Sequence, residues 1–156
     1  MLAVVDNRPV LLNLKTALTY FLDHRREVVV RRTKFELRKA EARAHILEGL
    51  LKALDHIDEV VALIRASDTP QEAKDRLMAR FELSDVQAQA ILDMRLQRLT
   101  GLERGKLEEE LRELLEKIAW YQSILADPKV LWGVIRDEVA YIKQTYSTPR
   151  RTEVIR

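Results

Sequence analysis

The sequence has 156 residues, no cysteine, and a formal net charge of only +2, although charged residues make up 33% of it. The length suits about one domain. The lack of cysteine excludes disulfides, cysteine-ligated zinc sites and cysteine nucleophiles. The small net charge gives no argument for a nucleic-acid partner, so only the distribution of charge could indicate one.

Neither a membrane span nor a secretion signal is visible in the sequence. No apolar run approaches the ~18 residues of a transmembrane helix. The N-terminus lacks the basic segment followed by an apolar segment that is typical of a signal peptide. We therefore expect a cytoplasmic protein without a membrane partner.

Residues 1–13 are predicted to form a β-hairpin. Two short apolar runs, 2–5 and 10–12, flank the segment Asp6-Asn7-Arg8-Pro9. These four residues are typical of a tight turn, because Asp and Asn bond to their own backbone and Pro restricts it. An isolated hairpin is marginally stable in water, so we expect it to pack on something else.

Residues 14–57 are predicted to form one long outgoing helix of a coiled coil. Asn13 is a suitable N-cap, and no Pro follows until well past the end of this range. A strict seven-residue repeat favours a supercoiled helix pair over a free helix. The repeat consists of Leu14, Phe21, Val28, Phe35 and Ala42.

Residues 58–101 are predicted to form a small helical head. A short helix over 58–67 begins with acidic residues, which the helix dipole favours at that end. Two capping boxes, Thr69 to Glu72 and Ser84 to Gln87, mark the next two helix starts. The last of these helices is predicted to continue to Leu99, before the Thr100-Gly101 break.

Residues 102–147 are predicted to return as helices, followed by a polar tail or linker over 148–156. A cap and restart are expected at Asp127-Pro128. The fold class is therefore all-α: a long antiparallel coiled-coil hairpin with a small helical head, plus a short N-terminal β-hairpin. In antiparallel register, paired positions should add to roughly 160. The returning seam is Leu107, Leu111, Leu114, Ile118, Tyr121 and Leu125, continued by Leu131, Ile135, Val139, Ile142 and Tyr146.

The sequence contains no recognisable catalytic or metal-binding pattern. The three histidines stand alone, without a carboxylate partner at metal-ligand spacing. The glycines are scattered, so no phosphate-binding loop is present. The four tyrosines, Tyr20, Tyr121, Tyr141 and Tyr146, fall on or beside apolar stripes and are interpreted as packing residues. No residue is predicted to be catalytic.

The head has more apolar surface than three short helices can bury. Such a surplus suggests a self-complementary patch and therefore a two-fold dimer. The predicted dimer interface consists of Ala88, Ile91, Leu92, Met94, Arg95, Leu96, Leu99 and Leu102.

The outgoing helix carries a basic stretch. From His24 to Arg43 there are eight Lys or Arg residues against three Glu, which gives this segment a local charge of about +5. Two interpretations remain open: a solvated flank of the coiled coil, whose long stems cover the seam, or transient contact with DNA phosphates. The DNA-proximal candidates are Arg25, Arg26, Arg31, Arg32, Lys34, Arg38 and Lys39.

Two long runs carry a resemblance to a known family. Residues 31–51, from Arg31-Arg-Thr-Lys-Phe-Glu to Glu-Gly-Leu-Leu51, resemble the long-helix segment of bacterial DNA gyrase A subunits. Residues 87–103, Gln87-Ala-Gln-Ala-Ile-Leu-Asp-Met-Arg-Leu-Gln-Arg-Leu-Thr-Gly-Leu-Glu103, resemble the exit-gate helices of the same subunits. The resemblance extends over nearly the whole chain.

The resemblance implies a role in a type IIA topoisomerase, which changes DNA supercoiling by ATP-dependent double-strand passage. This region would be the coiled-coil arm and C-terminal dimer gate, or C-gate. The catalytic tyrosine lies upstream in the family, and none of the four tyrosines here has its context. The implied partners are a second copy of the chain, transiently bound double-stranded DNA, and the gyrase B subunit. ATP and magnesium would be bound by the other subunit.

Two alternatives stay open at this point. One is a free-standing structural coiled-coil protein that dimerises and has no role on DNA. The other is the equivalent region of topoisomerase IV. The chain is expected to be an excised segment of a longer protein.

Overall fold

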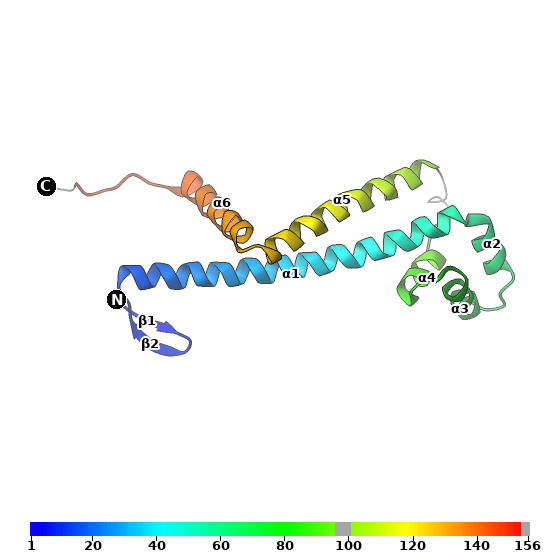
Figure 1. The fold of residues 1–156 in the computed structure, drawn as a ribbon, viewed down its shortest axis with the longest axis horizontal. Coiled ribbons are helices and arrows are strands. Elements are labelled where there is room, and N and C mark those ends of the chain that lie inside the picture. The colour runs from blue at the N-terminus through cyan, green and yellow to red at the C-terminus, as the bar shows by residue number, and fades with distance from the viewer. Residues whose placement is uncertain (96–100, 154–156) are drawn as a thin grey trace. The chain divides into compact units, whose positions relative to one another are not determined.

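The computed structural model describes residues 1–95 and 101–153, without the side chain of Leu102, and consists mainly of helices with one β-hairpin (Figure 1). This agrees with the predicted helical fold class and its short N-terminal hairpin. The elements are, in chain order, β1 (Leu2–Val5), β2 (Arg8–Leu11), α1 (Leu14–Asp55), α2 (Ile57–Arg65), α3 (Pro70–Phe81), α4 (Asp85–Leu92), α5 (Gly101–Ala126) and α6 (Pro128–Tyr146).

The hairpin pairs β1 and β2 antiparallel, with Leu2 opposite Leu11 and Val4 opposite Pro9. The connection has only two residues, Asp6 and Asn7, with φ angles of 49° and 60°. Positive φ at both central residues is characteristic of a type I′ turn, whose twist matches that of the strands. Asp and Asn tolerate this conformation better than other non-glycine residues.

Side-chain caps define several helix starts, as the sequence predicted. The Asn13 side chain accepts a hydrogen bond from the Thr16 amide at 2.8 Å before α1. Thr69 accepts from the Glu72 amide before α3, and Asp127 accepts from the Lys129 amide before α6. The capping box at α4 is complete. At α3 the Glu72 carboxylate instead accepts from the backbone of Asp68, one residue before the cap.

The predicted seam of α1 is wrong, because Val28 is half-buried and the other four of its five members are exposed. Phe35 is 55% exposed and Ala42 is also exposed, whereas Thr33 and Ala40 are buried. Two residues along an α-helix correspond to a rotation of about 200°, so the predicted stripe lies on the opposite side. The buried stripe keeps a seven-residue spacing and consists of Thr33, Ala40, Leu47 and Leu54.

The predicted seam of α5 is confirmed, because its members from Leu107 to Leu125 are buried or half-buried. In α6 the seam holds only for Leu131 and Ile135. The last three predicted members, Val139, Ile142 and Tyr146, are exposed.

Helix α4 is shorter than predicted. It ends at Leu92, and Asp93 donates its amide to the carbonyl of Gln89 as the C-cap. The Gln89 side chain donates to the Asp93 carboxylate, while the Met94 amide bonds to Ile91 in a tighter turn. Because the segment carries no Gly or Pro until Gly101, its local sequence gave no sign of this early end.

The chain divides into two compact units. Unit 1 comprises Met1–Phe35 and Gln122–Arg156 and contains the hairpin, the first half of α1 and α6. Unit 2 comprises Glu36–Tyr121 and contains the second half of α1, helices α2 to α4 and most of α5. In unit 1, Arg25 and Arg32 of α1 both pair with Glu138 of α6.

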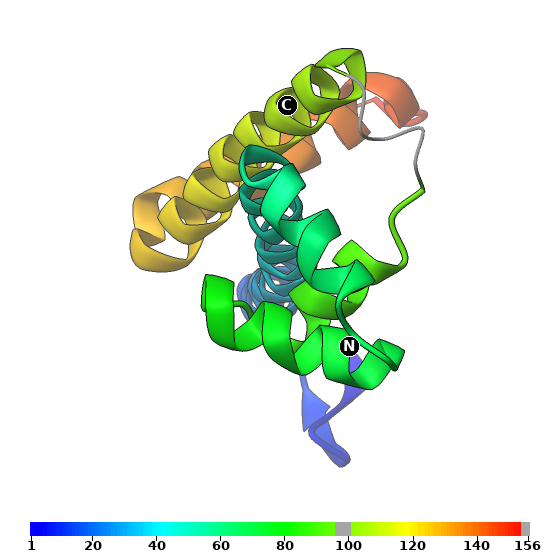
Figure 2. The ribbon, with the colours of Figure 1, turned by 90° about the vertical axis from the view of Figure 1, so that its right-hand side faces the viewer.

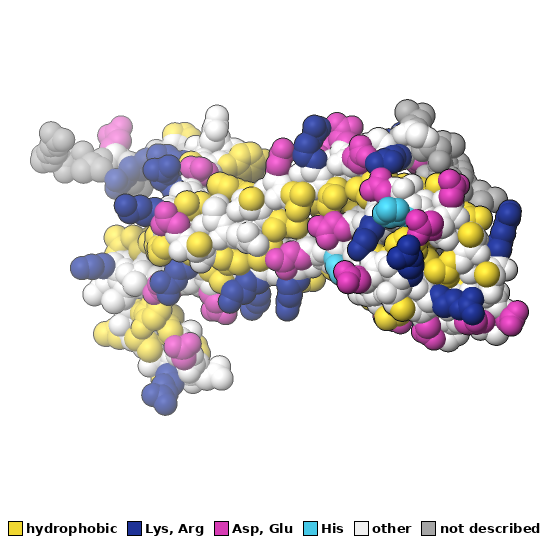
Figure 3. All heavy atoms as spheres, turned by 45° about the vertical axis from the view of Figure 1, so that its right-hand side comes forward, with side chains coloured by type: hydrophobic (Ala, Val, Ile, Leu, Met, Phe, Trp, Pro, Cys, Tyr) yellow, Lys and Arg dark blue, Asp and Glu magenta, His cyan; other side chains and the backbone are white. Residues whose placement is uncertain are grey.

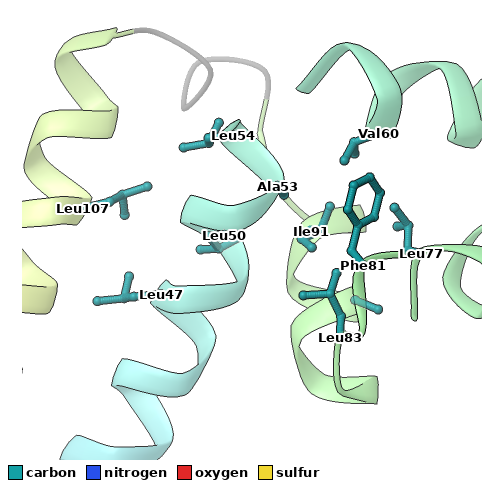
Figure 4. Packing of buried hydrophobic residues seen from close by; sticks show 11 residues of the cluster. Leu47, Leu50, Ala53, Leu54, Val60, Leu77, Phe81, Leu83, Ile91 and Leu107 are labelled. Atoms are coloured by element: carbon teal, nitrogen blue, oxygen red, sulfur yellow. The ribbon is translucent and has the colours of Figure 1, made fainter. Parts of the chain in front are cut away.

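The main core lies in unit 2, where the second half of α1 is covered on two sides. Leu47 of α1 lies beside Leu107 of α5, whereas Ala53 faces Ile91 and Phe81 of the head (Figure 4). Helices α2, α3 and α4 gather beside the end of α1 (Figure 2). The ion pair between Arg104 and Asp55, at 2.6 Å, joins α5 to α1 and fits the predicted antiparallel register.

Candidate functional site

The predicted interface residues from Ala88 to Arg95 differ in how much of their surface is exposed. Ala88 and Ile91 are buried, at 0% and 4% exposure, in the core of unit 2. Leu92 and Met94 are half-buried against the same core, and Arg95 is exposed. The first two residues therefore stabilise the fold of the single chain. Surface for a second copy is offered by the other three.

The remaining predicted interface residues are not placed by the structure. Leu96 and Leu99 lie outside the described residues, as does the side chain of Leu102. Met94 and Arg95 line a groove whose α1 side is formed by Arg43 and Ile46. The sequence prediction of a two-fold interface at this end of the head therefore stays a prediction.

The basic stretch contains two kinds of cation. Arg25 and Arg32 bind Glu138 from two positions one heptad apart, and the Nε of Arg25 is buried. Arg26 and Arg31 are exposed, and each makes only a long ion pair, with 3.9 Å between its guanidinium nitrogen and the carboxylate oxygen of Asp23 or Glu27 one turn earlier. Within the part of the chain that the structure describes, Lys34, Arg38 and Lys39 form no ion pair and are exposed.

These contacts separate the cations that are accessible to a phosphate from those that are already paired within unit 1. Arg25 and Arg32 neutralise a carboxylate inside unit 1, so they serve the packing of α1 against α6. Arg31, Lys34 and Arg38 are spaced three and four residues apart and share one face of α1. On the face drawn in Figure 3, Lys and Arg side chains lie interspersed with Asp and Glu. Any phosphate contact would therefore be weak and local.

Arg43, at the end of the basic stretch, joins two helices of unit 2. Its guanidinium donates two hydrogen bonds to Glu110 of α5, at 2.7 and 3.0 Å. These bonds raise the pKa of Arg43 above its ordinary value, because they stabilise the charged form, while partial burial opposes them. Arg43 thus joins α1 to α5 as a permanent cation.

The tyrosines do not lie where the sequence predicted. Only Tyr121 is half-buried, whereas Tyr20, Tyr141 and Tyr146 are 41%, 64% and 72% exposed. Three of the four are therefore not packing residues in this chain. No group of His, Asp and Glu that could hold a metal ion occurs among residues 1–95 and 101–153. Within the same ranges, no helix is long and apolar enough to cross a membrane.

Sequence reasoning missed a polar cluster in unit 2 that involves His45. Its Nε2 lies 2.7 Å from the Ser84 hydroxyl, and its backbone carbonyl accepts from the Gln87 side chain at 2.7 Å. His56 has a different role, because its ring stacks on Phe81 at 5.7 Å between centroids. The one available signal was the glycine at position 49, a residue that weakens the interior of a helix.

The chain is mainly helical, with one long helix and a compact head of three short helices. The family described as the A subunit of DNA gyrase and topoisomerase IV matches residues 1–140. The chain belongs to this family.

Individual relatives agree with the family match. The chain is 77% identical over 156 residues to a DNA gyrase A subunit from Lawsonia intracellularis. It is 58% identical over 156 residues to the equivalent protein from Clostridium acetobutylicum and 56% identical over 153 residues to that from Deinococcus deserti. These matches cover 98–100% of this chain but only 19% of the length of each relative.

Proposed function

We propose that this segment is the coiled-coil arm and C-gate of a DNA gyrase A subunit, within a type IIA topoisomerase that changes DNA supercoiling by ATP-dependent double-strand passage. The observation that supports this most is the 77% identity, over the whole chain, to a protein named as the A subunit of DNA gyrase. The family description also covers topoisomerase IV, whereas these three relatives are named gyrase.

In this proposal the chain positions the dimer contact and contributes no catalytic residue. The described residues contain no cluster that fits a metal ion, so no step is assigned to magnesium here. ATP and magnesium would be held by the gyrase B subunit. The antiparallel helices would carry the head away from the rest of the gyrase A protein, and two heads would meet across a two-fold axis. A double-stranded DNA would leave through that contact.

The first experiment tests the gyrase assignment. The corresponding segment of the Lawsonia intracellularis gyrase A protein is replaced by this sequence, and ATP-dependent supercoiling is measured in the presence of the gyrase B protein. We expect the chimera to retain activity within about threefold, because most contacts are kept. A free-standing coiled-coil protein without a role on DNA would give a folded but inactive chimera, and that result would overturn the assignment.

The second experiment tests the dimer gate in the 156-residue chain. Leu92→Asp and Met94→Asp introduce charges that a dimer contact would bury without a partner, at a cost of several kcal/mol. This corresponds to at least a tenfold rise in the dimer dissociation constant, at about 1.4 kcal/mol per factor of ten. Sedimentation equilibrium measures the constant, and circular dichroism checks the fold.

The matched control is Val86→Asp, on the same helix as Leu92. Val86 is 55% exposed and is not among the predicted interface residues, so its substitution should leave the dissociation constant unchanged. A wild-type chain that remains monomeric at ~100 μM, where any complex with a micromolar constant would form, contradicts the gate proposal.

A further inference from the structure

A polar contact joins the side of α1 to the first turn of α4 in unit 2. His45 and Gly49 contribute from α1, and Ser84 and Gln87 from the start of α4. Gln87 is 7% exposed, one of the few buried polar side chains among the described residues. A buried amide is retained only where its donors and acceptor find partners, so its bonds define one orientation.

The Gln87 side chain bonds to both helices at once. Its oxygen accepts from the Ser84 amide at 3.0 Å, which closes the capping box of α4. Its nitrogen donates to the His45 carbonyl of α1 at 2.7 Å. The same nitrogen lies 3.4 Å from His45 Nδ1, and His45 Nε2 lies 2.7 Å from the Ser84 hydroxyl. One amide thus fixes the start of α4 against α1.

Gly49 makes this approach possible. A Cβ atom at this position would lie 2.7 Å from Gln87 Cγ and 2.8 Å from Gln87 Cβ. Both distances are too short for carbon atoms, so any other residue would push Gln87 away from α1. The glycine lies in the interior of a 42-residue helix, where it weakens the helix relative to alanine. Close contact with the neighbouring helix explains why it is accommodated there.

The polar contact complements the apolar ones. Ala88 and Ile91 also hold α4 in the core, but apolar contacts are non-directional. Hydrogen bonds to a backbone carbonyl fix both the rotation and the position of α4 along α1. The position of α4 in turn determines where Leu92 and Met94 lie.

We propose that Gln87 is a positioning residue, which together with Gly49 sets α4 against α1 and thereby sets the geometry of the dimer contact. The inference rests on the proposed function for its effect on the dimer, whereas the contact between the helices is tested independently of it.

The test is a double-mutant cycle in the 156-residue chain, with Gly49→Ala, Gln87→Ala and the double variant. Gly49→Ala should lower Tm by about 5 °C or more. In a chain of this size, a shift of this magnitude is expected when one core contact is disrupted. In the double variant the clash of the added methyl with the Cγ of residue 87 is removed, whereas its close approach to the Cβ of residue 87 remains. The Tm of the double variant should therefore be higher than the sum of the two single shifts predicts.

Gly105→Ala in α5 is the matched control, because a Cβ there meets no atom within 4 Å. This variant should leave Tm unchanged or raise it, since alanine favours a helix. If Gly49→Ala behaves like Gly105→Ala, or if the two shifts of the cycle simply add, the contact between the helices does not act as proposed.

The positioning role is measured by the dimer dissociation constant of Gln87→Ala, at a temperature where circular dichroism shows it to be folded. We expect a rise of at least fivefold, and partial recovery in the double variant. An unchanged constant in the folded variant overturns the positioning role. A wild-type chain that does not dimerise contradicts the gate proposal itself, whereas the Tm cycle still reports on the contact, so the two failures are distinguishable.

Discussion

At the scale of single residues, Leu47 packs α1 against α5. Its side chain is fully buried, on a helix that packs against α5 on one side and the head on the other (Figure 4). Two neighbours on α1, Leu50 and Ala53, are almost as deeply buried. Close packing of this kind leaves little room for the surroundings to collapse when side-chain volume is removed.

Leu47→Ala should therefore destabilise the chain by about 2–5 kcal/mol, the range for buried Leu→Ala substitutions that leave a cavity. Leu115→Ala in α5 is the control, because this leucine is 48% exposed, and its change should stay below about 1 kcal/mol. Urea unfolding followed by circular dichroism measures both, at one fixed protein concentration. Equal losses for the two variants would contradict the assigned core.

At the scale of elements, the start of α3 depends on one side chain. Thr69 accepts a hydrogen bond from the Glu72 amide, and Pro70 occupies the first helical position. Without the threonine hydroxyl, one of the unpaired amides of the first turn loses its partner. Thr69→Ala should therefore cost about 1 kcal/mol in the free energy of unfolding.

Thr19→Ala provides the comparison for this prediction. Thr19 is exposed within α1, and its hydroxyl donates to the Lys15 carbonyl of the preceding turn, a group that is already bonded within the helix. Its replacement should change stability by less than about 0.5 kcal/mol. A loss at Thr69 no greater than that at Thr19 would show that α3 is held by packing and not by its cap.

The elements that could be predicted from the sequence are those set by local chemistry. The caps at Asn13, Thr69, Ser84 and Asp127 depend on neighbours within three residues, so their residue types were sufficient. The end of α4 at Leu92 carries no such signal. The buried face of α1 was misassigned because the helix has apolar residues on two faces, and only tertiary packing selects between them.

The candidate site could be predicted only in part, for a related reason. The number and position of the cations in α1 are visible in the sequence, but Glu138, which binds Arg25 and Arg32, lies more than a hundred residues away. The cluster of His45 and Gln87 likewise depends on a contact between distant segments. Only a structure could separate the cations that serve packing from those that remain exposed.

At the scale of the whole chain, this separation changes which residues should contact DNA. The sequence alone pointed to the seven cations between Arg25 and Lys39 as one set. Replacing Arg25 and Arg32 together would remove both partners of Glu138, so loss of function there could come from the fold. The cations that can be tested cleanly are exposed ones on α1: Arg31, Lys34, Arg38 and Lys39.

Replacement of these four residues by Gln should weaken binding of duplex DNA to the 156-residue chain without a change in helicity. Each cation that neutralises a phosphate contributes about 0.9 to the slope of log K against log salt concentration, so the slope should fall by up to about 3.6. Fluorescence anisotropy between about 50 and 200 mM salt measures the slope, because four such contacts weaken binding by roughly a hundredfold over that range.

The control carries the same change in charge at other exposed positions: Arg65, Arg112, Lys117 and Arg136 replaced by Gln. If binding follows only the net charge, both quadruple variants lose affinity equally, and the basic stretch is a solvated flank of the arm. If phosphates are contacted along α1, the slope of log K against log salt concentration falls only in the first variant. In the proposed function a duplex in transit must be released, so we expect the wild-type affinity to be weak at physiological salt. Tight binding there would contradict a role in strand passage.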